Sequence, residues 1–278
     1  MIQISAFADE IAKDVEDQLE ALHRDGISHL DLRAAWGTPV LQLSDKQLDR
    51  LEHLLQARGV QVAAIASPIG KTPIDAPFHE EIDRLERAIL LARRLGSRWI
   101  RIFSFFPPAR AGTSFSWADQ REEVLLRLRE LTARARAAGV VLIHENEKEI
   151  YGDTVERTVD LLRAIDDPHF RAAFDPANYI QCAQTPYPDG YNAVQPWISY
   201  VHVKDALADG RVVAAGEGVA RWLELLGQLR TDGYDGFLSL EPHLAAGGRF
   251  SGFTGPDLFH HAANALQGLL AQLQWEYA

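Results

Sequence analysis

The sequence lacks several features by which whole classes of protein are recognised. It has one cysteine, Cys182, in 278 residues, which excludes an internal disulfide and a thiolate zinc cluster within one chain. No uncharged apolar stretch approaches the roughly 18 residues of a membrane-spanning helix. The first residues show no basic segment followed by an apolar core, so no secretory signal is expected. These absences favour a cytoplasmic protein without a membrane partner.

Basic residues are also scarce relative to acidic ones. The chain carries 28 lysines and arginines against 39 aspartates and glutamates, for a formal net charge of −11. Surfaces that bind nucleic acids or anionic membranes normally carry a basic patch. We therefore expect no nucleic-acid partner. A small neutral substrate, or one whose charge a metal ion offsets, fits this composition better.

What the sequence does contain is a repeat of an amphipathic segment, a glycine and a short apolar run. Gly26, Gly59, Gly96 and Gly139 each precede such a run, where glycine supplies the left-handed conformation just past a helix end. The apolar runs number eight: residues 2–8, 29–33, 60–67, 99–104, 140–145, 170–175, 200–204 and 237–241. A last helix is expected over 257–276.

Eight strands that alternate with helices predict one α/β domain, a (β/α)8 TIM barrel over residues 1–278, because such a barrel takes about 250 residues. An open, doubly wound sheet is the alternative. It is disfavoured because no Gly-x-Gly-x-x-Gly motif follows the first strand.

Four runs in the second half end in a residue that can bind a metal ion: Glu145, Asp175, His202 and Glu241. A buried carboxylate is costly unless a cation or hydrogen-bond donors compensate its charge. In a TIM barrel, equivalent strand ends meet at one face, so these residues suggest one shared cation. Three carboxylates and an imidazole favour Mn²⁺ or Mg²⁺, with Co²⁺ or Zn²⁺ possible. Alternatively, each acid caps a helix or pairs with a basic neighbour.

Other residues near these strand ends are candidates for catalysis. Lys204 follows His202 by two positions and so points to the same side of its strand, where it could stabilise an oxyanion or pair with an acidic neighbour. His144 and Lys148 flank Glu145, but strand alternation puts His144 on the opposite face, which favours a structural role. Trp36 follows the second strand and could stack on a sugar or simply pack a loop.

Residues 144–148, 174–178, 201–206, 216–218 and 239–243 resemble the xylose-isomerase-like TIM barrels known as sugar phosphate isomerases/epimerases. This superfamily includes ketose 3-epimerases, inosose dehydratases, hydroxypyruvate isomerases and endonuclease IV. The resemblance covers essentially the whole chain. It is specific for the fold and the metal site and weak for the substrate.

The resemblance implies that Glu145, Asp175, His202 and Glu241 bind one divalent metal ion, with Mn²⁺ favoured. It further implies that Glu145 and Glu241 move the proton, through a metal-bound enediolate. Lys204 and His144 are additional catalytic candidates. Substrate-binding candidates are Asn178, Lys148, Glu217 and Trp36. The pattern departs from the epimerases at Asn178, where they carry a histidine, and at Tyr151, where they carry a glutamate.

The function expected from these residues is isomerisation or epimerisation of a sugar or keto-sugar. The alternative is a lyase on the same scaffold, either a keto-inositol dehydratase or the large subunit of a 3-oxo-C-glycoside deglycosidase, which works with a small β-rich subunit. A homo-oligomer is otherwise expected. An endonuclease IV-like enzyme is a remote alternative, because the histidines of its three-zinc cluster are missing after the third and fourth strands.

Overall fold

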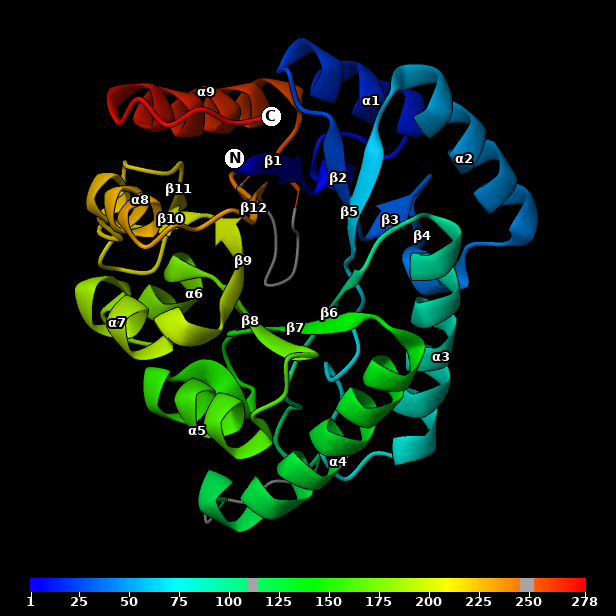
Figure 1. The fold of residues 1–278 in the computed structure, drawn as a ribbon, viewed down its shortest axis with the longest axis vertical. Coiled ribbons are helices and arrows are strands. Elements are labelled where there is room, and N and C mark those ends of the chain that lie inside the picture. Colours follow the sequence, from blue (N-terminus) through cyan, green and yellow to red (C-terminus); the bar gives the residue numbers. More distant parts are fainter. Residues whose placement is uncertain (110–114, 246–252) are drawn as a thin grey trace.

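Parallel strands close into a barrel in the order β1-β12-β9-β8-β7-β6-β5-β2 (Figure 1). The computed structural model describes residues 1–109, 115–245 and 253–278. The barrel strands are β1 (Gln3–Ala6), β2 (His29–Leu32), β5 (Gln61–Ile65), β6 (Trp99–Ile102), β7 (Val141–Glu145), β8 (Phe170–Phe174), β9 (Ile198–Val203) and β12 (Phe237–Leu240). Each lies within or overlaps one of the eight apolar runs, so the predicted single (β/α)8 barrel is confirmed.

Helices surround this ring of strands on the outside (Figure 1). They are α1 (Val15–Arg24), α2 (Asp45–Arg58), α3 (Phe78–Arg94), α4 (Trp117–Ala138), α5 (Val155–Ile165), α6 (Pro176–Gln181), α7 (Tyr191–Val194), α8 (Trp222–Thr231) and α9 (Pro256–Gln272). Helix α9 ends before the predicted residue 276. The glycines predicted to terminate helices adopt positive φ, for example 64° at Gly59 and 75° at Gly139.

Two small antiparallel sheets extend the loops at the carboxyl ends of β2 and β9. They pair β3 (Ala34–Ala35) with β4 (Thr38–Pro39), and β10 (Asp205–Ala206) with β11 (Val212–Val213). The second hairpin is fixed by the buried Asp205, whose carboxylate accepts backbone N–H groups from Ala206, Gly216, Gly218 and Ala220.

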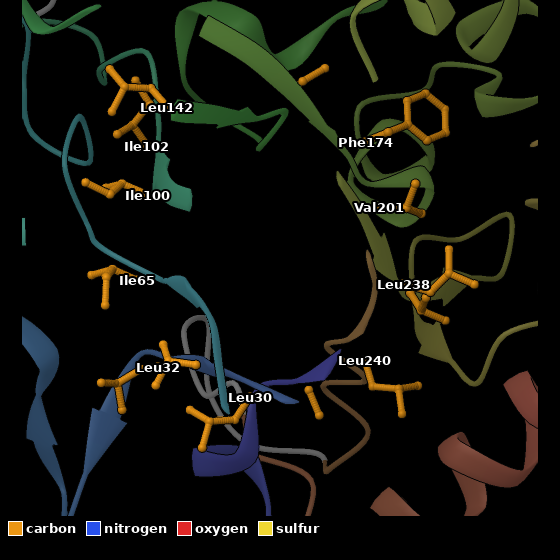
Figure 2. Close-up of a cluster of buried hydrophobic side chains, with 14 of the residues drawn as sticks. Leu30, Leu32, Ile65, Ile100, Ile102, Leu142, Phe174, Val201, Leu238 and Leu240 are labelled. Carbon is orange, nitrogen blue, oxygen red and sulfur yellow. The ribbon is translucent and has the colours of Figure 1, made fainter. Parts of the chain in front are cut away.

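Alternate residues of each strand face the helices and the inside of the barrel. Figure 2 shows the outward set arranged around the ring of strands, with Ile100 and Ile102 of β6 on one side and Phe174 and Val201 on the other. These side chains belong to the large buried cluster that packs the helices against the barrel. The residues between them in sequence therefore point inward.

The interior of the barrel is packed at one end and polar at the other. A small cluster of Ala63, Ala64, Ile143, Ala173 and Tyr200 fills the packed part. Beside it, the buried Asp31 accepts hydrogen bonds from Ser5 (2.7 Å), Tyr200 (2.6 Å) and Ser239. Three hydroxyl groups thus satisfy the hydrogen-bonding requirement of this buried carboxylate.

Among the described residues, no helix is both long enough and apolar enough to cross a membrane.

The loop after β5 depends on a glycine that cannot be replaced without a clash. Gly70 has φ +82°, and an added Cβ would lie 2.2 Å from the carbonyl oxygen of Phe103. We expect Gly70→Ala to lower the free energy of unfolding by clearly more than Gly59→Ala, which shares the positive φ but has open space around it and should cost about 1–2 kcal/mol. Urea denaturation of both variants measures the difference, and equal losses would contradict the clash.

Candidate metal centre

The four predicted ligands come together at the carboxyl ends of β7, β8, β9 and β12. Glu145 is the last residue of β7, Asp175 and Glu241 directly follow β8 and β12, and His202 is the penultimate residue of β9. Each offers one ligand atom, and these atoms all lie within 4.8 Å of one another. All four side chains are buried. Inward alternation on adjacent strands accounts for this convergence.

His202 lies between the two glutamates. Its Nδ1 is 3.3 Å from Glu145 Oε1 and 3.4 Å from Glu241 Oε2. Burial alone lowers the pKa of His202, but the two carboxylates outweigh it and raise the pKa to about 10. Phe7 packs edge-on against the imidazole, with ring centroids 5.2 Å apart. The ring is therefore held with Nδ1 facing the carboxylates.

Lys204 enters the same space from β9. Its ammonium lies 2.9 Å from Asp175 Oδ2 and 3.4 Å from Glu241 Oε2. The contacts confirm the expectation that Lys204 and His202 point to one side. Burial lowers the pKa of Lys204, but Asp175 and the neighbouring glutamates reverse this and raise it, so the lysine stays charged. Burial raises the pKa of Asp175 to about 6, although Lys204 opposes that shift.

Arg101, on β6, is a member of the centre that the sequence reasoning missed. One guanidinium nitrogen lies 3.0 Å from Glu145 Oε2 and 3.3 Å from Glu241 Oε1. Burial and Glu241 raise the pKa of Glu145, but His202 and Arg101 outweigh them and lower it to about 2. An arginine in the middle of an apolar run, inward by alternation, was the available signal, because such a charge requires a partner.

Asn178, predicted to bind substrate, is hydrogen-bonded to the predicted ligand Glu145. Its Nδ2 donates to Glu145 Oε1 (3.1 Å) and to the carbonyl of Asn146 (2.9 Å). Asn146 in turn bonds the backbone of Asp175 through both ends of its amide. Asn178 is buried and orients Glu145 against the first turn of α6.

The residues present fit a divalent cation. His202 Nδ1 is buried and makes no hydrogen bond with any described residue, although two carboxylate oxygens face it. An unsatisfied imidazole nitrogen amid buried carboxylates is the arrangement that a bound metal ion completes. Glu145, Asp175, His202 and Glu241 would hold the ion, and the oxygen-rich set suits Mn²⁺ or Mg²⁺.

A second group of potential ligands shares Glu241. It consists of Glu10, Glu241 and His243, with His243 Nε2 3.1 Å from Glu10 Oε1 and 3.5 Å from Glu241 Oε1. Arg33 reaches both acids, at 3.8 Å from Glu10 and 3.4 Å from Glu241, and it also bonds Asp9. Because Arg33 already supplies a positive charge, we expect no cation here.

A cavity of about 1090 Å³ opens above the centre, and Glu241 and Arg101 are among its walls. Lys148 lines it as well, with its ammonium 2.9 Å from Gln181 Oε1. The position of Lys148 agrees with its predicted contact with substrate. Neither Trp36 nor Glu217 is among the described residues that line the cavity.

Three predicted site residues lie elsewhere. His144 points outward, where its Nε2 bonds Ser104 Oγ at 2.9 Å, and burial lowers its pKa to about 4. Glu217 is exposed and bonds His261 on α9 at 2.7 Å. Trp36 packs under the guanidinium of Arg50, 4.8 Å from its ring centroid. These three residues belong to neither ligand group and line no part of the described cavity, so the catalytic role of His144 and the substrate-binding roles of Glu217 and Trp36 stay predictions.

The model of the family described as xylose isomerase-like TIM barrel matches residues 19–267. The chain belongs to this family. The family assignment agrees with the resemblance read from the strand-end motifs and with the closed eight-stranded barrel.

A curated relative is the 3-dehydroshikimate dehydratase of Bacillus anthracis, which is 22% identical over 246 residues, covering 81% of this chain and 84% of that protein. Two solved structures are similar in fold. The IOLI protein with a binding zinc atom gives a TM-score of 0.77 at 16% identity, covering 98% of this chain and 99% of that one. A D-tagatose 3-epimerase-like protein gives a TM-score of 0.76 at 20% identity, covering 99% of this chain and 98% of that one.

We predict that the purified chain binds one divalent ion through the four-residue cluster. His202→Ala should abolish stoichiometric Mn²⁺ binding, whereas His243→Ala should retain it, because only His202 belongs to that cluster. Elemental analysis and titration calorimetry measure the stoichiometry of each variant. Loss of the ion in His243→Ala together with its retention in His202→Ala would contradict the prediction. The ion would then bind at the group of Glu10, Glu241 and His243.

Lys204 should compete with the metal ion for Asp175 and Glu241. Replacing it with methionine leaves buried carboxylates unpaired, so metal-free Lys204→Met should lose about 3–5 kcal/mol of unfolding free energy. Added Mn²⁺ should then stabilise the variant more than the parent. Denaturation with and without Mn²⁺ tests this, with Lys46→Met on the exposed face of α2 as the control. Equal stabilisation of Lys204→Met and parent would refute the competition.

Proposed function

We propose that the protein is a divalent-metal-dependent isomerase or epimerase of a sugar or keto-sugar, with Mn²⁺ as the favoured ion. The observation that supports this is the pair of buried glutamates, Glu145 and Glu241, which face one centre from either side of His202. When bound, the metal ion supplies the electrophile that polarises a substrate carbonyl. The adjacent carbon then becomes acidic enough for a carboxylate to remove its proton.

The two glutamates are set up to exchange a proton with that carbon. Glu145 is oriented by Asn178 on one oxygen and by Arg101 on the other. Burial raises the pKa of Glu241, but Lys204 and the nearby histidines outweigh it and lower the pKa well below its usual range. Both glutamates are therefore ionised at neutral pH, the form that accepts a proton. One removes the proton and the other returns it to the opposite face.

Two buried cations stabilise the negative charge that proton removal creates on the substrate. The guanidinium of Arg101 and the ammonium of Lys204 both contact Glu241, so they lie beside the proposed base. Fixed charges in a site closed to water stabilise a developing anion without reorganising at the moment of reaction. Lys204 thus keeps its place as a catalytic candidate.

A lyase is the second candidate, and the similarity to a 3-dehydroshikimate dehydratase favours it. Removal of the same proton leads to loss of water when the next carbon carries a hydroxyl group that can leave. Isomerase and lyase therefore share the first step and differ in the substrate. The endonuclease IV-like alternative has no such support, because neither ligand group of the described residues takes a histidine from the ends of β5 or β6.

We infer that the partner of the centre is a small molecule, since the similar proteins include a 3-dehydroshikimate dehydratase and a D-tagatose 3-epimerase-like protein. Assembly as a homo-oligomer, or with a small β-rich subunit if the protein cleaves C-glycosides, stays a prediction.

The Mn²⁺-loaded protein should catalyse exchange of deuterium from D₂O into the carbon next to the carbonyl of its substrate. Free ketoses, 3-keto-glucosides, a keto-inositol and 3-dehydroshikimate form the panel, and NMR detects the exchange. A new sugar identifies an isomerase or epimerase, whereas loss of water identifies a lyase. No exchange with any compound would sink the proposal.

Glu241→Gln provides the matched test of the base. It keeps the size of the side chain and removes its charge, so we expect at least a roughly hundredfold loss of exchange rate. Metal content is measured in the same samples, because a loss of Mn²⁺ would explain a loss of activity on its own. A variant that holds Mn²⁺ and exchanges at the parent rate would remove Glu241 from this role.

A further inference from the structure

The cavity above the centre has the opposite charge balance from the rest of the chain. Across the sequence, acids outnumber lysines and arginines by 39 to 28. On the cavity wall, six cations face three acids, Asp9, Asp83 and Glu241. The six are Arg33, Lys71, Arg84, Arg87, Arg101 and Lys148. A cationic cleft in an acidic protein attracts and retains anions.

The lysines of the chain are also concentrated at this cavity. The chain has only five lysines, and arginine supplies nearly all the other positive charge. Lys71 and Lys148 line the cavity, and Lys204 lies in the centre below it. Lys13 and Lys46, the remaining two, are exposed on the outside. Lysine is thus concentrated at the site rather than spread over the surface.

Lys71 and Lys148 share one carboxylate. Lys71 Nζ lies 3.1 Å from Glu147 Oε2, and Lys148 Nζ lies 3.5 Å from Glu147 Oε1. A single glutamate neutralises only one of two ammonium groups. Among the ion pairs of the described residues, the two lysines therefore share one carboxylate, and both side chains remain partly exposed on the cavity wall.

Arg84 and Arg87 extend this basic wall along α3. Arg84 pairs with the buried Glu81, which also anchors Gly70 and Thr72 next to Lys71. Arg87, one turn further on, donates to the carbonyl of Leu43 at 2.6 Å and makes no ion pair with a carboxylate among the described residues. The guanidinium of Arg87 therefore stays available on the wall, where the exposed Asp83 lies one turn before it on α3.

The basic wall lies within reach of a molecule bound at the centre. Lys71 Nζ is 4.2 Å from the ring centroid of Phe103, and the guanidinium of Arg101 is 5.0 Å from the same centroid. Arg101 contacts Glu145 and Glu241 directly. One aromatic ring therefore contacts both Lys71 and Arg101, and Arg101 contacts the two glutamates.

We propose that the substrate carries an anionic group, a carboxylate or a phosphate, that Lys71, Lys148 and Arg87 bind while its carbonyl end lies at the Glu145–Glu241 centre. This inference rests on the proposed function and narrows its substrate class. A purely structural role for the cations would match each with an acid, as Arg33 is matched with Asp9. The shared Glu147, and an Arg87 that has no ion pair within the described part of the chain, leave charge for a ligand.

The test compares matched ketones in D₂O with the Mn²⁺-loaded protein. D-fructose is the neutral compound, D-fructose 6-phosphate is the phosphate, and 3-dehydroshikimate is the carboxylate. We expect exchange with an anionic ketone at a kcat/KM at least about tenfold above that for the neutral one. The better anion distinguishes carboxylate from phosphate. Exchange with the neutral ketone at equal or higher kcat/KM would overturn the proposal while leaving the proposed function intact.

Three variants assign the effect to residues. Lys71→Gln, Lys148→Gln and Arg87→Gln should each raise KM for the anionic ketone about tenfold, and should raise KM for the neutral ketone by a smaller factor. Lys46→Gln, on exposed α2, is the matched control and should change neither. Unchanged KM in all three variants would overturn the assignment.

A binding measurement keeps the anion site testable if no compound exchanges deuterium. Inorganic phosphate, titrated calorimetrically into the parent protein, should bind with an affinity that falls about tenfold in Lys71→Gln and Arg87→Gln. Phosphate that binds equally to the parent and to both variants would refute the anion site. No exchange combined with variant-sensitive phosphate binding would instead reject the proposed reaction alone.

Discussion

The rest of this molecule depends on the need to compensate three carboxylates that are buried within a few ångströms of one another. Glu145, Asp175 and Glu241 would repel each other strongly in a space from which water is excluded. Without a metal ion, Arg101, Lys204 and the protonated imidazole of His202 supply three opposing charges from within the fold. A divalent ion bound at the cluster would take the place of the His202 proton, so we expect metal binding to release that proton.

The same requirement explains why the cluster of Glu145, Asp175, His202 and Glu241 could be predicted from the sequence. An acid or histidine at the end of an apolar run has few structural explanations, and four of them with strand-helix-strand spacing converge by the geometry of a barrel. Arg101 was harder to place, because it sits inside a run that otherwise resembles an ordinary core strand. Its significance depends on the residues it meets across the barrel, which are more than 40 positions away in sequence.

The predicted site residues that lie away from the cavity, or that contact other protein groups, are in loops or depend on local geometry. Trp36 and Glu217 follow strands, but the loop after a strand sets its own direction, and neither side chain turns to the cavity. Asn178 was expected to touch substrate, yet the first turn of α6 aims its amide back at Glu145. Strand alternation was the more reliable guide, as the outward His144 illustrates. Loop positions carry no such periodic constraint.

The four hydrogen bonds that the Asp205 carboxylate accepts from backbone N–H groups affect how the site binds its ligand. They fix the loop that follows Lys204, and a Cβ at Gly218 would lie 2.3 Å from the Asp205 carboxylate, so the arrangement tolerates little change there. The indole of Trp222 holds the carbonyl of Lys204 from the other side. The conformational entropy of this segment is lost during folding, so the free energy of substrate binding is not diminished by ordering it.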